Sequence, residues 1–349
     1  MSKKIAVAVG TRPEIIKMSP VIRELRRLEM DHYVIHSGQH YSYCLDRVFF
    51  EQLKLPRPRY RLEVGSGAPG RQTAQIVVGA ERVFLRNRPD VVLVQGDTNT
   101  VLGTALAASK LGIPVGHVEA GLRSYDRTMP EEINRTLADH CSDYLFAPTP
   151  KTRDILLGEA IPKKKIFVTG NTIVDAVMQN SSHAKSGLDE DYILVSLHRQ
   201  ENVDDPVRFA RIAESLKQVS RRFQLPVVYP IHPRSRKMAK KFGISFGSVR
   251  VMRPVDYFTF LGMQKGAKLV MTDSGGVQEE ACILGVPCVT LRENTERPET
   301  VSAGSNMIAG TEPDKILRCA GKMMRKARRW KNPFGRGDSA RRIVRILQD

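Results

Sequence analysis

Short apolar runs alternate along the chain with longer segments in which apolar residues recur every three or four positions. In the segment after the first run, Ile15, Met18, Ile22 and Leu25 fall on one face of a helix. The short runs are rich in Val and Ile, as expected for buried strands. The runs that we interpret as strands are residues 5–9, 34–36, 91–95, 115–118 and 145–147 in the first half, and 193–197, 227–231, 249–252, 269–271 and 286–291 in the second.

Alternating strands and helices predict parallel sheets with helices on both faces. Because this alternation of strands and helices occurs twice along the chain, we predict an α/β protein with two Rossmann-like, doubly wound domains. The first would comprise residues 1–180 and the second residues 192–331, with the polar stretch 181–191 as a linker. Residues 332–349 contain a basic helix at 339–348, and the pattern does not indicate its packing partner. Ligands of open parallel sheets bind beyond the carboxyl ends of the strands, so the residues after each strand are the candidates for chemistry.

The first predicted strand is followed by Gly-Thr-Arg-Pro-Glu at residues 10–14. Gly10 permits a tight turn, and Pro13 suits the first turn of a helix, where a missing N–H costs nothing. A helix N-terminus attracts an anion, and Arg12 and Lys17 would add positive charge. The same residues also fit an ordinary strand–helix turn with solvated cations, so the spacing alone leaves phosphate binding open.

Two further strands of the first half end in a carboxylate at the same predicted sheet edge, Asp97 and Glu119. A helix then begins near Pro130, with Glu131 and Glu132 in its first turn. Crowded carboxylates raise each other's pKa, which suits proton transfer near neutral pH. The alternative is structural, with Asp97 as a helix cap and both glutamates as favourable first-turn charges. It suits Glu132 better than Glu119, and a helix N-terminus favours a base over an acid at Glu131.

Two strands of the second half end in histidines, His198 and His232. Each fits a structural role as well as a ligand contact, and no converging third ligand indicates a metal site. The most specific local signal is Thr-Asp-Ser-Gly-Gly-Val-Gln-Glu-Glu at 272–280, which can form a backbone cradle for a diphosphate at a helix start. Glu280 would then accept hydrogen bonds from ribose hydroxyls. A plain glycine-rich turn is the alternative, and the pattern matches neither the P-loop nor G-x-G-x-x-G.

Composition and charge narrow the partners of the chain only slightly. With 349 residues, 41% hydrophobic and 26% charged, the chain suits about two globular domains and excludes a disordered, collagen-like or disulfide-scaffold protein. The net charge of +18 fits a polyanionic ligand. The first apolar run is too short for a signal peptide, and no run is long enough to span a membrane. Five scattered cysteines without a C-x-x-C pair argue against disulfides and a zinc site and favour a cytoplasmic location.

Taken together and in order, the motifs are more specific than any one of them. They read G-T-R-P-E-x-x-K, G-D-T, H-V-E-A-G-L-R, P-E-E-x-N-R, H-R-x-E-N, D-S-G-G-x-Q-E-E and T-E-R-P-E. The set extends from about Lys4 to N-P-F-G-x-G at 332–337. It resembles the non-hydrolysing UDP-N-acetylglucosamine 2-epimerases, and the residues within the motifs are most similar to those of archaeal members.

The resemblance implies a GT-B-type fold with the active site in the cleft between two Rossmann-like domains. It implies the reversible conversion of UDP-GlcNAc to UDP-ManNAc with no cofactor and no metal. In the family's mechanism, anti elimination of UDP across C1–C2 gives 2-acetamidoglucal, and UDP adds back after protonation on the opposite face. The residues suit this chemistry. A C2 hydrogen without an adjacent ketone is a poor acid, so its removal needs a departing group at C1, and two proton transfers on two faces need at least two acid/base groups.

By position, the resemblance assigns three sets of residues. We expect Asp97 and Glu131 to transfer the C2 proton, Glu119 to steer or share that transfer, and His198 to assist departure of the diphosphate. The substrate-binding set would be Arg12, Lys17, Arg135, Phe260 against uracil, Ser274, Gly275, Gly276, Glu280 and Arg297. A second UDP-GlcNAc activates bacterial members, and the matching positions here are Gln39, His40, Arg71, Gln72, Glu131, Arg199 and His232. Ser42 replaces a Gln of that activator site, so the retention of activation stays open. Val255 occupies another uracil-recognition position, where bacterial members can have Gln, and this affects only that one contact.

Family members are typically homodimers, so we expect a homodimer that binds a UDP-sugar and neither nucleic acid nor a membrane. The nearest rival is a GT-B UDP-sugar glycosyltransferase, which would not need several carboxylates at C2. A 2-epimerase of another UDP-2-acetamido sugar, such as a diacetamido uronate, is a closer variant of the same activity. The sequence of residues 10–14 favours the GlcNAc type, because members of the diacetamido-uronate type tend to differ there. A nucleic-acid-binding protein would explain the charge, but the basic clusters carry no recognised motif. Surface polysaccharide and glycoprotein glycan biosynthesis both fit as pathways.

Overall fold

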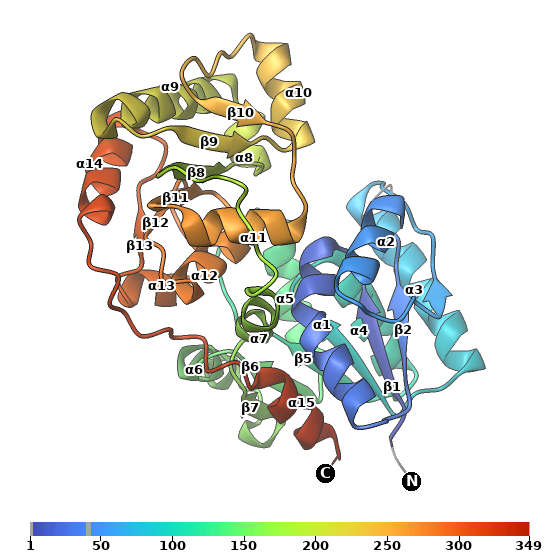
Figure 1. Cartoon of the computed structure of the whole chain (residues 1–349). Coiled ribbons are helices and arrows are strands. Elements are labelled where there is room, and N and C mark those ends of the chain that lie inside the picture. The colour runs from blue at the N-terminus through green and yellow to red at the C-terminus, as the bar shows by residue number, and fades with distance from the viewer. Residues whose placement is uncertain (1–2, 40–42, 349) are drawn as a thin grey trace. The chain divides into compact units, whose positions relative to one another are not determined.

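The computed structural model describes residues 3–39 and 43–348, and its contacts divide the chain into two compact units (Figure 1). The first unit contains the chain up to Ala176 and the C-terminal segment from Phe334 onward, and the second is Val177–Pro333. His40 and Ser42, two positions of the predicted activator site, lie outside the described residues. Each unit is a parallel sheet with helices, so the predicted α/β, doubly wound fold class is confirmed.

The sheet of the first unit has seven parallel strands in the order β3-β2-β1-β4-β5-β6-β7. Its strands are β1 (Ile5–Val9), β2 (His32–His36), β3 (Tyr60–Arg61), β4 (Val91–Gln95), β5 (Val115–Val118), β6 (Tyr144–Ala147) and β7 (Ile166–Val168). Its helices are α1 (Arg12–Arg27), α2 (Tyr43–Gln52), α3 (Pro69–Arg86), α4 (Asn99–Lys110), α5 (Pro130–His140) and α6 (Pro150–Gly158), followed by α7 (Thr172–Asn180), which extends into the second unit.

The sheet of the second unit repeats the order with six parallel strands, β10-β9-β8-β11-β12-β13. Its strands are β8 (Ile193–Ser196), β9 (Val227–Pro230), β10 (Arg250–Met252), β11 (Leu269–Thr272), β12 (Cys288–Thr290) and β13 (Asn306–Ile308). Its helices are α8 (Gln200–Val203), α9 (Pro206–Phe223), α10 (Pro233–Phe242), α11 (Tyr257–Gly266), α12 (Gly275–Ile283), α13 (Pro298–Ser302) and α14 (Pro313–Met324).

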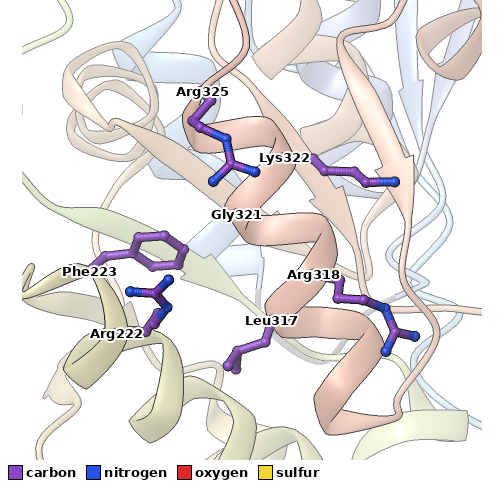
Figure 2. Close-up of a pocket in the computed structure, with 7 residues that line it drawn as sticks. All are labelled: Arg222, Phe223, Leu317, Arg318, Gly321, Lys322 and Arg325. Atoms are coloured by element: carbon purple, nitrogen blue, oxygen red, sulfur yellow. The ribbon is translucent and has the colours of Figure 1, made fainter.

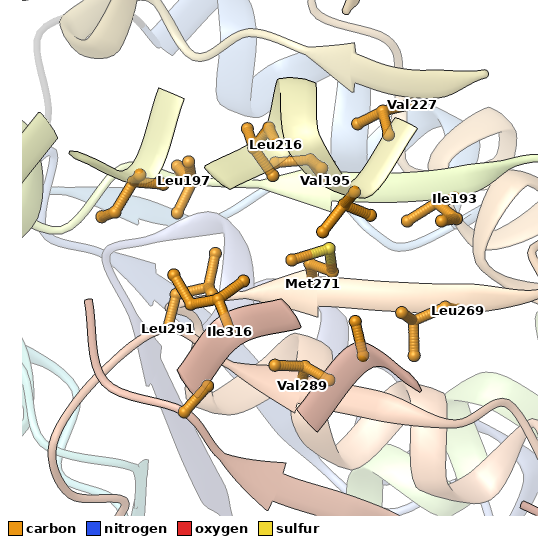
Figure 3. Close-up of a cluster of buried hydrophobic side chains, with 14 of the residues drawn as sticks. Ile193, Val195, Leu197, Leu216, Val227, Leu269, Met271, Val289, Leu291 and Ile316 are labelled. Atoms are coloured by element: carbon orange, nitrogen blue, oxygen red, sulfur yellow. The ribbon is translucent and has the colours of Figure 1, made fainter. Parts of the chain in front are cut away.

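Side chains that alternate along the strands build a core on each face of the second sheet. Ile193, Val195 and Leu197 point into a cluster that includes apolar residues of α9 and α14 (Figure 3). Tyr192 and Leu194 point into a second cluster with residues of α11 and α12. Because both faces are covered, the strands are apolar throughout, which is why the sequence pattern reveals them.

The C-terminal helix α15 (Ser339–Gln348) belongs to the first unit. The carboxylate of Asp175 accepts hydrogen bonds from the backbone N–H groups of Ser339 and Ala340, at 3.2 and 3.0 Å, and so caps the start of this helix. The helix packs against α1. The packing partner that the sequence did not indicate is therefore the first helix of the chain.

In both sheets the strand order reverses at the middle. The reversal lies between β1 and β4 in the first sheet and between β8 and β11 in the second. Crevices at such reversal points, beyond the carboxyl ends of the strands, are where doubly wound sheets bind ligands. The residues after these four strands, together with those after the neighbouring β5, are therefore the candidates for ligand contact. None of the helices in the described chain combines the length and apolar character that a membrane span requires.

Candidate active site

The turn after β5 holds Glu119 in a buried position among hydrogen-bond donors. The ammonium of Lys17, on α1, lies 2.7 Å from Oε1 and 2.9 Å from Oε2 of Glu119. The side-chain amide of Gln95, the last residue of β4, donates to Oε2, and that of Asn171 donates to Oε1 at 3.4 Å. The positive charge of Lys17 compensates a carboxylate that burial would otherwise penalise.

The backbone of this turn is held in an unusual conformation. Glu119 has φ +74°, a region that residues with a side chain rarely adopt, and Gly121 has φ +82°. The N–H groups of Glu119 and Ala120 both donate to the carbonyl of Phe146, at 3.1 and 3.2 Å. A Cβ at Gly121 would lie 2.4 Å from the carbonyl oxygen of Thr152. A side chain at position 121 would therefore clash with the backbone, so this turn requires glycine there.

Asp97 follows β4 and forms an ion pair with Arg135 of α5. Arg135 is buried and also contacts Glu132 at 2.9 Å, whereas the Asp97 side chain is 28% exposed. The amide of Asn134 donates to the backbone carbonyl of Asp97 and to the side chain of Asn99, both at 3.0 Å. The P-E-E-x-N-R motif thus supplies the groups that hold Asp97, while one face of its carboxylate stays accessible. Arg135, predicted to bind substrate, is engaged by these two carboxylates.

Glu14 is a buried carboxylate that links the turn after β1 to the loop after β4. It accepts hydrogen bonds from the backbone N–H groups of Gly10 and Thr11 and from the hydroxyl of Thr98. Burial raises the pKa of Glu14 to about 7, although these three hydrogen bonds act in the opposite direction. The nearby charge of Asp97 adds to the increase. Glu14 is therefore a titratable group whose hydrogen-bond partner, Thr98, directly follows Asp97, a predicted acid/base residue.

Arg12 and Glu131 lie closer to solvent than Lys17 and Glu119. Arg12 is exposed, and its guanidinium lies 5.3 Å from the ring centroid of Phe49. Glu131 is half-buried in the first turn of α5. Of the two residues predicted to bind an anion, Arg12 thus makes a surface contact, whereas Lys17 forms a buried ion pair.

Two residues of the predicted activator set contact each other beside the loop after β4. Gln72 is buried and donates to the backbone carbonyl of Gln39 at 3.1 Å, and its side-chain oxygen accepts from Asn99 at 2.7 Å. The side-chain oxygen of Gln39 accepts from the N–H and hydroxyl of Thr100, at 3.1 and 2.7 Å. Arg71, in contrast, is exposed on α3.

In the second unit, Asp273 organises the loops at the sheet reversal. This buried residue follows β11 and accepts from the backbone N–H groups of His198 and Arg199 and from the amide of Asn202. The His198 ring nitrogen Nδ1 lies 3.4 Å from its carboxylate. Burial lowers the pKa of His198; Asp273 opposes this, and Arg199 adds to the lowering. The ring centroids of His198 and His232 are 5.7 Å apart, so the two predicted histidines are neighbours.

The glycine-rich turn begins α12, with Ser274 at the N-cap and Gly275 as the first helical residue. A Cβ at Gly275 would lie 2.6 Å from Oε1 of Glu296, whereas a Cβ at Gly276 would meet nothing closer than 4.0 Å. Burial by itself would raise the pKa of Glu296, but Arg297, Arg292 and Arg199 together lower it well below its usual range. The turn thus lies against a buried cluster of carboxylate and guanidinium groups, and its helix N-terminus presents backbone N–H groups.

The remaining predicted nucleotide contacts are fixed by partners of their own. Glu280 is buried and accepts from the side chain of Gln264 at 2.6 Å. Arg297 is buried and pairs with Glu279 at 2.6 Å. Phe260 is half-buried on α11 and packs at the edge of the core.

The family model of UDP-N-acetylglucosamine 2-epimerase matches residues 23–348. The chain belongs to this family. The predicted family is therefore confirmed, and with it the class of enzyme, an isomerase.

Relatives of this epimerase-family chain match it over nearly its whole length. The UDP-N-acetylglucosamine 2-epimerase of Methanocaldococcus jannaschii is 51% identical, with 99% of this chain and 98% of that protein covered. A crystal structure of the enzyme from that organism, in complex with UDP-GlcNAc and UDP, matches with a TM-score of 0.93 over 99% of each chain. The UDP-2,3-diacetamido-2,3-dideoxy-D-glucuronate 2-epimerase of Pseudomonas aeruginosa is 40% identical over 99% of each chain.

Sequence reasoning missed several residues that hold the predicted epimerase site together. Gln95 donates to Glu119, and Asn171 reaches the same carboxylate. His117 is a fully buried polar residue within β5, and its partner Asp139 lies on α5. A histidine inside an otherwise apolar strand, Val-Gly-His-Val, is a signal that could have identified His117. Gln95 is the polar last residue of an apolar strand, and its position was a comparable signal.

A pocket of the second unit lies at the ends of α9 and α14 (Figure 2). It encloses about 320 Å³, and four cationic side chains surround Phe223, Leu317 and Gly321: Arg222, Arg318, Lys322 and Arg325. Because α9 ends where the chain turns back to begin β9, this pocket lies at the edge where the strands start. It is therefore separate from the loops at the strand reversal of the same sheet. Within residues 3–39 and 43–348, no group of three His, Cys, Asp or Glu residues is arranged to hold a metal ion.

Proposed function

We propose that this enzyme interconverts UDP-GlcNAc and UDP-ManNAc by inverting C2 of the sugar. The observation that carries the proposal is the gathering of Asp97, Glu119 and Glu14 at the carboxyl edge of the first sheet, each held by named donors. The second unit adds a glycine-rich helix start that suits a diphosphate. The M. jannaschii relative is named a UDP-N-acetylglucosamine 2-epimerase, and the crystal structure of the enzyme from that organism contains UDP-GlcNAc, which supports the choice of substrate.

In the proposed first step, a carboxylate removes the C2 proton while the bond between C1 and the diphosphate oxygen breaks. The electron pair of the C2–H bond becomes the C1=C2 double bond, and the pair of the C1–O bond leaves with UDP. The products are 2-acetamidoglucal and UDP. Asp97 is the candidate that the structure favours as a base, because its carboxylate is partly exposed while that of Glu119 is enclosed by donors.

In the proposed second step, a protonated carboxyl group delivers a proton to the opposite face of C2. The diphosphate oxygen attacks C1 and re-forms the glycosyl bond, so UDP-ManNAc results with no net change in atoms or charge. Glu131 is the candidate for this group, because it is half-buried at the start of α5, on the helix that also carries the partner of Asp97. In the reverse reaction Glu131 would be the base, which is the role that its place at a helix N-terminus favours. Glu119, paired with Lys17, would steer the transfer by fixing the charge near C2.

We propose that the second unit binds the UDP moiety of the substrate. The backbone N–H groups of residues 274–276 would donate to the diphosphate, and Phe260 would contact uracil. His198, whose lowered pKa leaves it neutral near pH 7, would donate a hydrogen bond to the departing phosphate rather than a full charge. Arg297 would act through its buried pair with Glu279, which supports the turn.

Proton NMR of UDP-GlcNAc with the enzyme in D₂O, without cofactor or acceptor, tests the proposal. We expect UDP-ManNAc to appear and deuterium to enter C2 of both epimers, because the proton removed exchanges with solvent before its return. A glycosyltransferase of the same fold would give neither result without an acceptor. Epimerisation with full retention of the C2 hydrogen would contradict a mechanism that uses separate acid and base groups.

The diacetamido-glucuronate relative supports a second candidate substrate for the same chemistry, since it is 40% identical over the whole chain. The same NMR assay with UDP-2,3-diacetamido-2,3-dideoxy-D-glucuronate decides between the two sugars. We expect the kcat/KM for UDP-GlcNAc to be the higher value. A higher value for the diacetamido uronate would reassign the substrate and leave the chemistry unchanged.

We also propose that a second UDP-GlcNAc activates the enzyme through Gln39, Arg71, Gln72, Arg199 and His232. The contact of Gln72 with Asn99 supports a link from this set to the loop that carries Asp97. With pure UDP-ManNAc as substrate, we expect sigmoidal or absent turnover that traces of UDP-GlcNAc relieve. Hyperbolic kinetics on pure UDP-ManNAc would remove activation from the account.

A further inference from the structure

His117 forms two hydrogen bonds from a fully buried position in the middle of β5. Its Nε2 lies 2.8 Å from the carbonyl oxygen of Gly96, and its Nδ1 lies 2.7 Å from Oδ1 of Asp139 on α5. A carbonyl oxygen only accepts hydrogen bonds, so Nε2 must carry a proton. A second proton must lie between Nδ1 and Asp139, since two lone pairs at this distance would repel each other.

The surroundings of Asp139 decide where the second proton resides. Its other oxygen, Oδ2, accepts from the backbone N–H of Gly121 at 3.2 Å and pairs with Arg123 at 2.8 Å. A carboxylate with donors on both oxygens is the ionised acceptor, so the proton belongs to the imidazole ring. Arg123 in turn pairs with Glu159 at 2.6 Å, so the four charges of this network balance in pairs.

The pKa directions of the pair agree with this protonation state. Burial by itself would lower the pKa of His117, but the charge and hydrogen bond of Asp139 raise it overall. Burial would raise the pKa of Asp139, but His117 and Arg123 lower it overall. The charged groups that face His117 are Asp139 from α5 and Arg123 from the segment after β5, with Gly96 contributing only its carbonyl from the end of β4.

The two hydrogen bonds of the pair reach the two turns that carry predicted acid/base residues. Gly96, which accepts from His117, immediately precedes Asp97 and has φ +86°. Gly121, which donates to Asp139, ends the turn that contains Glu119. His117 and Asp139 therefore connect the Gly96–Asp97 peptide to the Ala120–Gly121 peptide, which begins one residue after Glu119.

We propose that the His117–Asp139 ion pair is a positioning device that fixes the Asp97 and Glu119 turns relative to each other, and that turnover requires its imidazolium form. This inference rests on the proposed roles of Asp97 and Glu119 in proton transfer. Neither His117 nor Asp139 touches the sugar. A displacement of a catalytic group by about 1 Å costs roughly a hundredfold in rate, so a loss of this connection acts on kcat.

Two substitutions at His117 separate the two hydrogen bonds. The amide of His117→Asn lies near the position of Nδ1 and keeps a donor to Asp139, while the Gly96 carbonyl loses its donor. The longer amide of His117→Gln reaches toward Gly96, while Asp139 loses its partner. We expect kcat to fall between about 10-fold and 100-fold in both, while KM for UDP-GlcNAc and the Kd for UDP change less than threefold.

Matched controls distinguish positioning from general destabilisation. His140→Asn, on the exposed side of the same helix α5, should keep the wild-type kcat, because His140 lies at the rim of the network, 3.5 Å from Glu159. Asp139→Asn should reproduce the fall in kcat without altering a strand residue. If the His117 variants do not fold, Asp139→Asn and the measurement below still decide the question.

Nitrogen-15 NMR of the wild-type histidine rings gives a readout that needs no activity. We expect one imidazole to keep both ring nitrogens protonated at a pH where the exposed histidines have lost a proton, and this signal to be absent in His117→Asn. The wild-type kcat should decline as this ring loses its proton. A neutral ring in the fully active enzyme, or wild-type kcat in a folded His117 variant, would overturn the inference. Failure of the proposed function would look different, since the wild type itself would form no epimer.

Discussion

The ammonium of Lys17 lies 2.7 Å from the carboxylate of Glu119, and both side chains are buried. The two residues are 102 positions apart in sequence, and β4 lies between the strands that precede them. The pair thus connects α1 to the turn after β5 at the carboxyl edge of the first sheet. It gives Glu119 a fixed place and a compensated charge beside the partly exposed Asp97.

Replacing Lys17 by Met should cost about 3–5 kcal/mol in the free energy of unfolding, because it leaves a buried carboxylate without its counter-charge. We also expect kcat to fall at least 10-fold, since the place of Glu119 is lost. Chemical denaturation and steady-state kinetics measure the two effects. Lys151→Met, at an exposed position of α6, is the control and should change neither.

The double variant Lys17→Met/Glu119→Gln separates stability from chemistry. Removing both charges should restore most of the lost stability, because no unpaired buried charge is left. Activity should stay low, because the carboxylate is absent. The losses in free energy of unfolding of Lys17→Met and Glu119→Gln can be added and compared with the loss of the double variant. If the double variant loses as much as this sum, the ion pair is not what holds the turn.

Asp97→Asn and Glu131→Gln should each lower kcat by roughly 10²–10⁴-fold, the contribution typical of a positioned acid or base. Stability should change little, because both side chains are partly exposed. Deuterium uptake at C2 measured alongside kcat shows which proton transfer is lost. Asp154→Asn, an exposed pair partner on α6, should leave both rates unchanged, and wild-type rates in Asp97→Asn would exclude it as a proton-transfer residue.

Gly275→Ala and Gly276→Ala form a matched pair in the glycine-rich turn. A Cβ at 275 would lie 2.6 Å from Glu296, so this variant should lose stability and bind UDP at least 10-fold more weakly. A Cβ at 276 would meet nothing closer than 4.0 Å. The free energy of unfolding of this variant should therefore lie within about 0.5 kcal/mol of the wild-type value. Denaturation and UDP titration calorimetry give the comparison. Equal effects of both substitutions on stability would contradict the packing described here.

Glu14 should make the stability of the enzyme depend on pH. Burial raises its pKa to about 7 from an ordinary value of 4.5, so the folded state holds a proton that the unfolded state has lost in this range. The stabilising contribution is present below pH 4.5 and declines as the pH rises through 7, with a slope of at most about 1.4 kcal/mol per pH unit. Glu14→Gln should flatten this decline, whereas Glu81→Gln on the exposed face of α3 should not. An unchanged slope in Glu14→Gln would assign the dependence to other groups.

The sequence predicts the long buried strands well and the short edge strands poorly. Residues such as Val91–Gln95 form continuous apolar runs because both faces of the sheet are covered. The strands β3, β7 and β13 were missed, since they have two or three residues each and lie at or next to a sheet edge, where no apolar run is required. The start of β12 at Cys288 rather than at 286 reflects a turn, because Val286 is apolar but bonds back to Ala281.

The residue types of the candidate site were predictable from the motifs, but their pairings were not. Asp97, Glu119 and Gly275 follow strand ends, where the sequence pattern points to chemistry. The partner of each depends on strand order and on helices far away in sequence, as Arg135 shows for Asp97 and Lys17 for Glu119. Lys17 was expected to bind an anion of the substrate, and the structure pairs it with an anion of the chain, the carboxylate of Glu119. Hydrogen bonds across sheet neighbours, such as His117 with Gly96, carry no local sequence signal.

UDP-GlcNAc labelled with ¹⁸O in the oxygen that bridges C1 and the β-phosphorus tests the central claim most directly. If UDP leaves and returns, the label should move into the non-bridging oxygens of the β-phosphate, and phosphorus NMR should record this together with deuterium uptake at C2. We expect both in the wild type and neither in Asp97→Asn. Inversion at C2 with the label still in the bridge would contradict elimination of UDP, and with it the proposed use of the carboxylates and the diphosphate turn.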